Sequence, residues 1–286
     1  MEYGLHLGVS GPTATPQYLI HFARRGEELG FFCVTVADHI VIPKKIVSPY
    51  PYTASGQYPG TGDQLEQLTV LSFLAGATQR IRLVASVMVT PYRNPLLAAK
   101  ELLGAPRFAD RGEVTDEYIR VFRELWTHDN PSFEGRYCRF SEIKFLPRSA
   151  QKRRIPIWIG GHSKRALRRA AALGDGWHPI GGVPTARLEP EDLRMDLDTL
   201  ARYAERAGRN PREITVAFKA SLYDREMETV PGRRRRFIGN AEEIASDVRA
   251  YKNVGVDYLI LDVRGPDAVQ ILERMEWLAK EVLPLV

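Results

Sequence analysis

The chain has 286 residues, enough for two average domains or for one large α/β barrel with a substantial core. Hydrophobic residues make up 44% of it and charged residues 26%, and these values exclude disordered, fibrous and disulfide-scaffold proteins. The net charge of +5 favours anionic partners in general, phosphorylated cofactors among them.

Strands are expected to alternate with helices from the start of the chain. The run 31–36 is continuously apolar, which is typical of a buried parallel strand, and Gly30 before it is a helix-ending residue. The first half is expected to hold, in chain order, a strand at 3–9, a helix at 16–29, a strand at 31–36, a helix at 64–78, a strand at 81–89 and helices at 95–103 and 113–128.

The second half repeats this alternation. It is expected to hold a strand at 155–159, a helix at 163–173, a very short strand at 176–177, a helix at 190–207, a strand at 214–222, a helix at 241–253, a strand at 256–263 and a last helix to about 283. Because strands alternate with helices and no linker divides the chain, we predict one (β/α) barrel domain over residues 1–286.

The expected strands number seven, whereas a complete barrel of this type has eight. The interval between the strands centred near 84 and 157 holds two helices and an irregular stretch, 132–146, whose alternation indicates a hairpin-like excursion. One βα unit therefore lacks its strand.

Cysteine content and apolar runs indicate the compartment. Cys33 and Cys138 are far apart and have no second Cys at metal-ligand or redox spacing, which argues for a reducing compartment and against a zinc site. No run approaches the roughly 18 apolar residues of a membrane span, and residues 1–8 lack a signal-peptide pattern. We expect a cytoplasmic protein without a metal site or a membrane partner.

Four consecutive arginines, 233–236, form the one dense basic cluster and follow the turn signal Pro231-Gly232. We expect a solvated loop there, with an anion contact as the alternative. Zinc-finger spacing and aromatic–basic patterns are missing from the sequence, so nucleic acid is not an expected partner.

The carboxyl ends of barrel strands are where active sites lie. The second strand leads into Asp38 and His39; a histidine there can exchange a proton near pH 7, or simply be hydrogen-bonded within its loop. Asp38 can fix the tautomer of His39 or support a nearby turn. The long segment 41–62, rich in Tyr and Pro, is interpreted as an active-site lid or as a flexible insertion.

A second candidate site follows the strand at 155–159. Gly160 and Gly161 lead to His162 and to Ser163, which can cap the next helix; such a turn allows a phosphate to approach backbone N–H groups, although Gly-Gly is also common in tight βα turns. Trp177 can wall the same pocket or belong to the core.

Several segments together resemble the luciferase-like monooxygenase superfamily, and especially its subgroup that uses the deazaflavin coenzyme F420. The similar stretches occur in family order at 28–31, 37–40, 78–83, 90–95, 116–118, 125–126, 156–161, 174–177 and 255–257. The resemblance implies a (β/α)8 barrel and two-electron redox chemistry on a bound flavin or deazaflavin.

The resemblance also implies roles for particular residues. His39 matches the position beside the cofactor ring, where it steers charge or protons, and Ser86 and Val87 match the residues that meet the ring, often through a strained peptide bond. Residues 160–163 match the phosphate-binding turn. One departure follows Lys100: roughly 25 residues that relatives place there are missing, about one strand with its flanks. This coincides with the missing strand in our count, and pairing of two chains at the gap would cover the exposed edges.

Three functions are open. The first is an oxidoreductase that transfers hydride between bound F420 and a small organic substrate. The second is a monooxygenase that uses flavin mononucleotide (FMN) and receives reduced flavin from a separate reductase. In the third, loss of the segment has left a catalytically impaired cofactor-binding or scaffold protein. A homodimer is expected.

Overall fold

The computed structural model describes residues 1–39, 50, 64–90, 93, 111–145, 155–182, 188–222 and 234–286. The expected helix at 95–103, the departure after Lys100 and, apart from Tyr50, the segment 41–62 lie outside these residues. No helix in the described ranges is long and apolar enough to cross a membrane.

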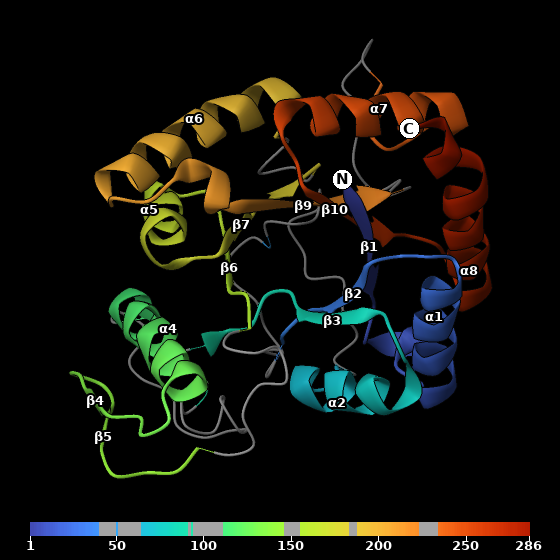
Figure 1. Cartoon of the computed structure of the whole chain (residues 1–286). Helices are drawn as coiled ribbons and strands as arrows, with labels where there is room; N and C mark the ends of the chain where they lie inside the picture. Colours follow the sequence, from blue (N-terminus) through green and yellow to red (C-terminus); the bar gives the residue numbers. More distant parts are fainter. Residues whose placement is uncertain are drawn as a thin grey trace.

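Parallel strands form the centre of the molecule (Figure 1). They are β1 (Glu2–Leu7), β2 (Cys33–Val36), β3 (Arg82–Ala85), β6 (Trp158–Gly160), β7 (Gly176–His178), β8 (Ile180–Gly181), β9 (Thr215–Leu222) and β10 (Tyr258–Val263). The spatial order is β3-β2-β1-β10-β9-β7-β6, and the short β8 also pairs with β9.

The last strand of the chain, β10, pairs with the first, β1, in register from Glu2 opposite Tyr258 to Leu5 opposite Leu261. First-to-last pairing is the arrangement of a closed barrel. The expected (β/α) barrel class is therefore confirmed. Apart from the short β8, which was missed, the seven expected parallel strands are the ones found. Among the described residues, β3 and β6 are the two ends of this sheet, the place where the sequence lacks a strand.

The helices surround the outer face of the sheet (Figure 1). They are α1 (Pro16–Glu28), α2 (Gln67–Ala77), α4 (Arg111–Thr127), α5 (Lys164–Leu173), α6 (Pro190–Arg206), α7 (Ala241–Val254) and α8 (Ala268–Trp277), with shorter helical turns η1 (Gly11–Thr13), η4 (Pro211–Glu213), η5 (Leu278–Val282) and η6 (Leu283–Leu285). Neighbouring helices contact each other in the order of the strands that they cover, from α2 and α1 to α8, then through η5 to α7, and on to α6, α5 and α4.

Capping explains where two helices begin and end. The expected start of the second helix at 64 is too early, because the Glu66 side chain accepts a hydrogen bond from the Thr69 N–H and α2 begins only at Gln67. The first helix ends before Gly30, whose φ of +83° suits the glycine predicted to end it.

The irregular stretch after α4 is a hairpin, as expected. Strands β4 (Phe133–Glu134) and β5 (Arg139–Phe140) pair antiparallel and are separate from the main sheet. The hairpin leaves the parallel sheet without a further strand from this part of the chain.

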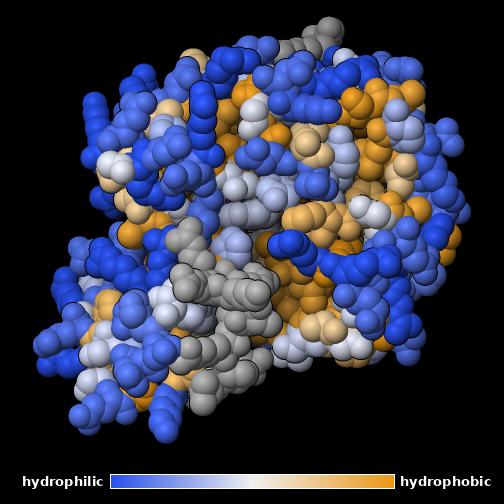
Figure 2. Space-filling model, viewed as in Figure 1, coloured by the Kyte–Doolittle hydropathy of each residue, from blue (hydrophilic) through white to orange (hydrophobic). Residues whose placement is uncertain are grey.

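Alternate side chains of the strands face opposite ways, as in any sheet. Leu5, Val34, Phe218 and Leu261 belong to the large core between sheet and helices. Figure 2 shows hydrophilic residues over much of the helices, and hydrophobic residues at the molecular surface near β2 and β3. The opposite, inner face of the sheet holds the candidate site.

Candidate active site

The inner face of the sheet is apolar toward the amino-terminal ends of the strands. Cys33, Ala217 and Ile260 are fully buried there, and partly buried hydrophobic side chains pack against them, among them Trp158 and Tyr258. A Cβ atom added to Gly4 would lie 2.5 Å from Cys33 Sγ, so the floor of the barrel is closely packed.

The inner face becomes polar closer to the carboxyl ends of the strands, two residues after the apolar positions. We call this set the inner polar layer: His6 of β1, Thr35 of β2, His178 of β7, Lys219 of β9 and Asp262 of β10. Each lies on the same face as the residue two positions earlier, so all five side chains point into the barrel below its mouth.

Both histidines of the inner polar layer are neutral at pH 7. His6 Nδ1 lies 2.8 Å from Thr35 Oγ1, and burial lowers the pKa of His6 to about 3, with Lys219 contributing. Burial also lowers the pKa of His178 to about 4, against the opposing hydrogen bond to Ala217. Neutral imidazoles provide one donor and one acceptor nitrogen each.

The tautomer of His178 follows from its partners. Its Nδ1 lies 2.5 Å from the Ala217 carbonyl oxygen, which can only accept, so Nδ1 carries the proton. Its Nε2 must then accept, and the Ser86 hydroxyl donates to it over 2.8 Å. Ser86 follows β3, so this hydrogen bond joins the ends of two strands that are not neighbours in the sheet.

Lys219 is the charged centre of the layer. Burial lowers the pKa of Lys219 to about 8, while Asp262 opposes this shift and Arg264 adds to it. The Asp262 carboxylate forms its ion pair with Arg264, at 2.6 Å, and the pKa of Asp262 is lowered because Arg264, His6 and Lys219 outweigh its burial.

Asp38 has a structural role in this geometry. Its carboxylate binds the guanidinium of the fully buried Arg93 through both oxygens and accepts the Val89 N–H at 2.8 Å. Arg93 also pairs with Glu66 at 2.8 Å. Of the two expected roles of Asp38, these contacts provide the turn support, and they fix the loop after β3 beside the loop after β2.

His39 follows Asp38 at the mouth. Burial lowers the pKa of His39, and Lys219 lowers it further, while Asp38 acts in the opposite direction. Lys219 therefore lies close enough to act on the charge of His39. A neutral imidazole at this place can accept a proton.

Ser86 and Val87 come next on the same rim, and the peptide bond between them is cis. The Val87 side chain is 42% exposed, unusual for a valine, and a Cβ atom added to Gly160 would lie 3.0 Å from Val87 Cγ1. The absence of a side chain at Gly160 therefore lets the rims at β3 and β6 approach each other.

The turn after β6 has the geometry of an anion site. Gly161 has a φ of +100°, and Ser163 caps α5 by accepting the Ala166 N–H at 3.1 Å, as expected. His162 Nδ1 is buried and has no hydrogen-bond partner in the part of the chain that the structure describes. A buried polar atom of this kind is available to bind a ligand atom.

Trp177 lies behind this turn. Its side chain has no exposed surface and belongs to the core between sheet and helices, and its Nε1 donates to the Gly161 carbonyl at 2.8 Å. Of the two expected positions, pocket wall and core, the structure therefore gives the core. Trp177 supports the turn from outside the barrel.

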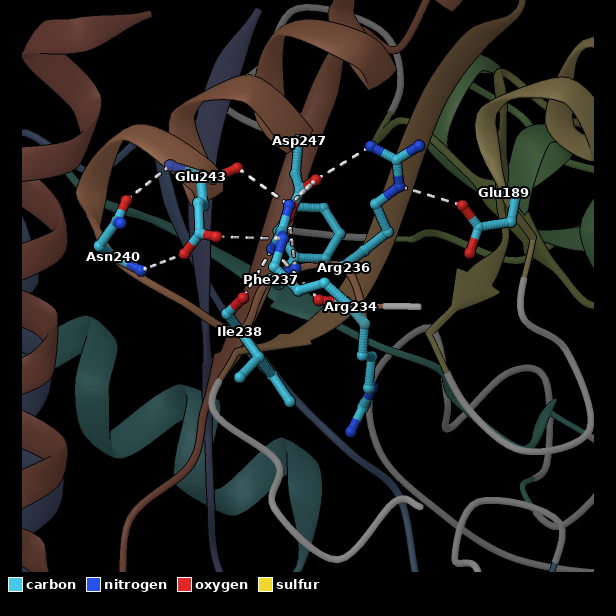
Figure 3. Close-up of polar contacts among 9 residues, drawn as sticks. Glu189, Arg234, Arg236, Phe237, Ile238, Asn240, Glu243 and Asp247 are labelled. Atoms are coloured by element: carbon cyan, nitrogen blue, oxygen red, sulfur yellow. Dashed lines mark hydrogen bonds and ion pairs between the residues drawn. The ribbon is translucent and has the colours of Figure 1, made fainter. Parts of the chain in front are cut away.

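The arginine cluster corrects one expectation. Arg234 and Arg236 both bind the fully buried Asp247 carboxylate of α7, at 2.7 to 2.9 Å, and the Phe237 N–H donates to it at 2.8 Å (Figure 3). Arg236 also reaches Glu189 at 3.0 Å. We call Asp247 with its two arginines the Asp247 clamp. It holds the chain after β9 to α7, so the expectation of a solvated loop is wrong for these arginines.

Lys219, His6 and Asp262 were not predicted as site residues, and Arg93 was not predicted as the partner of Asp38. The signal for Lys219 was present, because a lysine in the middle of a buried parallel strand is unusual. No group of three His, Cys, Asp or Glu side chains that could hold a metal ion occurs within the described ranges.

Comparison with known proteins assigns the family. The sequence model of the luciferase-like monooxygenase family matches residues 3–105 and 101–230, so this chain belongs to the luciferase-like monooxygenase family. The two matched segments meet at 101–105, where the sequence predicts the missing unit. Enzymes of this kind are oxidoreductases that use F420 or FMN.

Relatives with a stated activity use both cofactors. The chain is 32% identical to an uncharacterized protein of Mycobacterium bovis over 70% of this chain and 76% of that one. It is 22% identical to an FMNH2-dependent dimethylsulfone monooxygenase of Pseudomonas putida, over 79% and 80% of the two chains. It is 23% identical to an F420-dependent glucose-6-phosphate dehydrogenase of Amycolatopsis mediterranei, over 94% of each chain. That last alignment spans 341 positions, more than the chain has residues, so the relative carries segments that this chain lacks.

Solved structures share the fold. An F420-dependent secondary alcohol dehydrogenase, solved with an F420-acetone adduct, superimposes with a TM-score of 0.73 at 17% identity, covering 100% of this chain and 99% of that one. This similarity extends over the whole chain and agrees with the barrel described above.

The mouth fits a planar ring with a phosphorylated tail. Val87 offers exposed apolar surface for a ring, and His39 lies on the same rim. Gly160 and Gly161 leave room at the start of α5, where backbone N–H groups can bind a phosphate, and His162 Nδ1 lacks a partner among the described residues. These residues would hold the cofactor of the family.

Proposed function

We propose that the protein is an oxidoreductase that transfers hydride between bound F420 and a small organic substrate. The observation that carries this proposal is the position of a neutral histidine, His39, on the rim that also holds the exposed Val87 and faces the glycine turn. The F420-dependent relative supports it by its similarity over almost the whole chain.

In this function, the deazaflavin supplies the carbon that accepts or gives the hydride. The protein contributes the remaining groups. Residues 160–163 bind the phosphate, Val87 packs against the ring, and the Asp38–Arg93 pair holds the rim in place. His39, neutral before reaction, takes up the substrate hydroxyl proton as hydride leaves the adjacent carbon, and returns it in the reverse direction.

The FMN-dependent alternative has its own support, since one relative is an FMNH2-dependent monooxygenase. A separate reductase would then supply the reduced flavin. Titration of the purified protein with oxidised F420 and, separately, with FMN, followed by cofactor fluorescence, distinguishes the two. Micromolar affinity for F420 alone supports our proposal, whereas a preference for FMN replaces it with the monooxygenase. Binding of neither cofactor would contradict both.

His39→Ala tests the role of the histidine. Loss of a proton-transfer group typically slows turnover by about 10²–10⁴-fold, and we expect cofactor affinity to change little. Steady-state rates and fluorescence titration of the same preparation measure both quantities. Equal losses in rate and affinity would make His39 a binding residue instead.

We also propose that the chain forms a homodimer in solution. β3 and β6 each have a single neighbouring strand among the described residues, and sheet ends of this kind are usually paired or covered. Light scattering coupled to size exclusion measures the mass, and a monomer at all concentrations tested would overturn this proposal.

A further inference from the structure

The inner polar layer carries an excess positive charge. The titratable groups that face Lys219 are His6 from β1, His39 after β2, His178 from β7, and Asp262 with Arg264 at the end of β10. The histidines are neutral, and Asp262 is engaged by Arg264 at 2.6 Å. One positive charge therefore remains when Lys219 is an ammonium ion.

The Lys219 ammonium has no hydrogen bond or ion pair to any other described residue. On the inner face, Ile260 lies opposite Lys219 in the register and Ala217 comes two residues before it, and neither side chain is polar. Ser221 follows two residues later, and Asp262 of β10 attracts the Lys219 ammonium without forming an ion pair with it in the described part of the chain. The Lys219 side chain is only partly exposed, and a charge withdrawn from water without a hydrogen-bonded partner costs free energy that a methionine of similar length would avoid. The position thus has the character of a binding group awaiting an anion.

We propose that Lys219 binds a carboxylate of the organic substrate at the base of the mouth. The identity of the ligand as a substrate rests on the proposed oxidoreductase function, whereas the anion site rests on the barrel interior alone. A substrate held there by one end would place its reacting carbon toward His39, the group that shares the electrostatic environment of Lys219.

The charge and size of the site favour a carboxylate over a phosphate. A single ammonium near the neutral imidazoles of His6 and His178 balances a monoanion, whereas a phosphate dianion usually meets several cations or a row of backbone N–H groups. Such a row is present elsewhere, at the start of α5. Gly4, Cys33 and Ile260 form a closely packed floor, so the substrate carboxylate has no room to bind deeper in the barrel than Lys219.

The test measures the reactivity of Lys219 in the full-length protein without cofactor. Limiting N-hydroxysuccinimide acetate labels lysines at pH 7 in a carboxylate-free buffer, and mass spectrometry quantifies Lys219 against the exposed Lys252 of α7. Benzoate is the anionic probe, benzamide its neutral match and inorganic phosphate the dianionic comparison. Only a neutral amine reacts, so an anion that stabilises the ammonium slows labelling.

We expect benzoate to slow the labelling of Lys219 by about tenfold, the change produced by a rise of one pKa unit, and to leave Lys252 unchanged. Benzamide should give no protection, and phosphate less than benzoate. Equal labelling with and without benzoate would overturn the proposal, and so would equal protection by benzamide. Full protection by F420 or FMN alone, without protection by benzoate, would assign the anion to the cofactor and overturn it as well.

Lys219→Met provides the matched variant. Calorimetry should detect benzoate binding to the wild type and a loss of at least about tenfold in affinity in the variant, while cofactor titration gives the same affinity in both. Neither the labelling nor the benzoate calorimetry involves turnover. If no cofactor binds but benzoate still protects Lys219, the proposed function fails and the anion site remains.

Discussion

The Asp247 clamp and the inner polar layer place charged groups in the same barrel in opposite ways. In the clamp, one buried carboxylate receives four hydrogen bonds, from Arg234, Arg236 and the Phe237 N–H. In the layer, two histidines are held neutral by burial and the Lys219 ammonium has no partner among the described residues. The clamp is complete without a ligand, and the layer is not.

This difference separates structural from functional polar groups. A satisfied buried network stabilises one conformation, whereas unbalanced buried charge lowers stability and is kept where binding or catalysis needs it. Three measurements test whether the two regions differ as described.

The largest expected effect is acid destabilisation through the layer. His6 and His178 have a pKa near 6.5 when unfolded and about 3 and 4 when folded, so between pH 6.5 and pH 4 the unfolded chain binds more protons. Stability is complete above pH 6.5 and falls with decreasing pH, by at most about 2.7 kcal/mol per pH unit from these two groups. Urea denaturation at a series of pH values measures the slope. His178→Asn should remove about half of this contribution, and an unchanged slope would show that His178 is not held neutral.

The next effect concerns the clamp. Asp247→Ala leaves two arginines and one N–H without their acceptor, so we expect a loss of about 3–5 kcal/mol in the free energy of unfolding. Glu276→Ala is the control, because Glu276 pairs with Arg25 and Lys280 on the surface, where such pairs contribute about 0–1 kcal/mol. If Asp247→Ala lowers the free energy of unfolding no more than Glu276→Ala does, the Asp247 clamp does not stabilise the fold.

The smallest effect has the opposite sign. Lys219→Met should raise the free energy of unfolding at pH 7 by about 1–3 kcal/mol, because the variant no longer buries a charge. The gain should shrink above pH 8, since the wild-type lysine is then neutral in the folded state and its burial costs less. Thermal denaturation at pH 7 and pH 9.5 measures both values, and a destabilised variant would mean that Lys219 has a structural partner.

Much of the fold could be predicted because the sequence alternates strongly. The apolar run before Asp38 and the glycine after the first helix each indicate an element directly. The strand expected at 81–89 is shorter in the structure, where β3 ends at Ala85 and the next residues form the rim that Asp38 holds through the Val89 N–H. That contact joins two loops far apart in the sequence, and local patterns contain no information about it.

Only the residues at the rim of the candidate site could be predicted from the sequence. His39 and Ser86 each follow a strand and Gly160 ends one, so position along the chain places them at one edge. Lys219 and Asp262 lie within strands, and only the register of β9 against β10 gives them a common inner face. Asp38 was recognised as a site residue, but its partner Arg93 is 55 positions away, so its role depended on the structure.

The meeting of the rims near Ser86 and Gly160 has a practical consequence for ligand discovery. A molecule that contacts both the Val87 rim and the glycine turn bridges the two ends of the described sheet. Because such a molecule binds only the folded chain, its binding raises the free energy of unfolding. At a concentration one hundred times its dissociation constant, such a ligand contributes about 2.7 kcal/mol. Melting-temperature shifts in a metabolite library would therefore rank cofactors and substrates before any reaction is known.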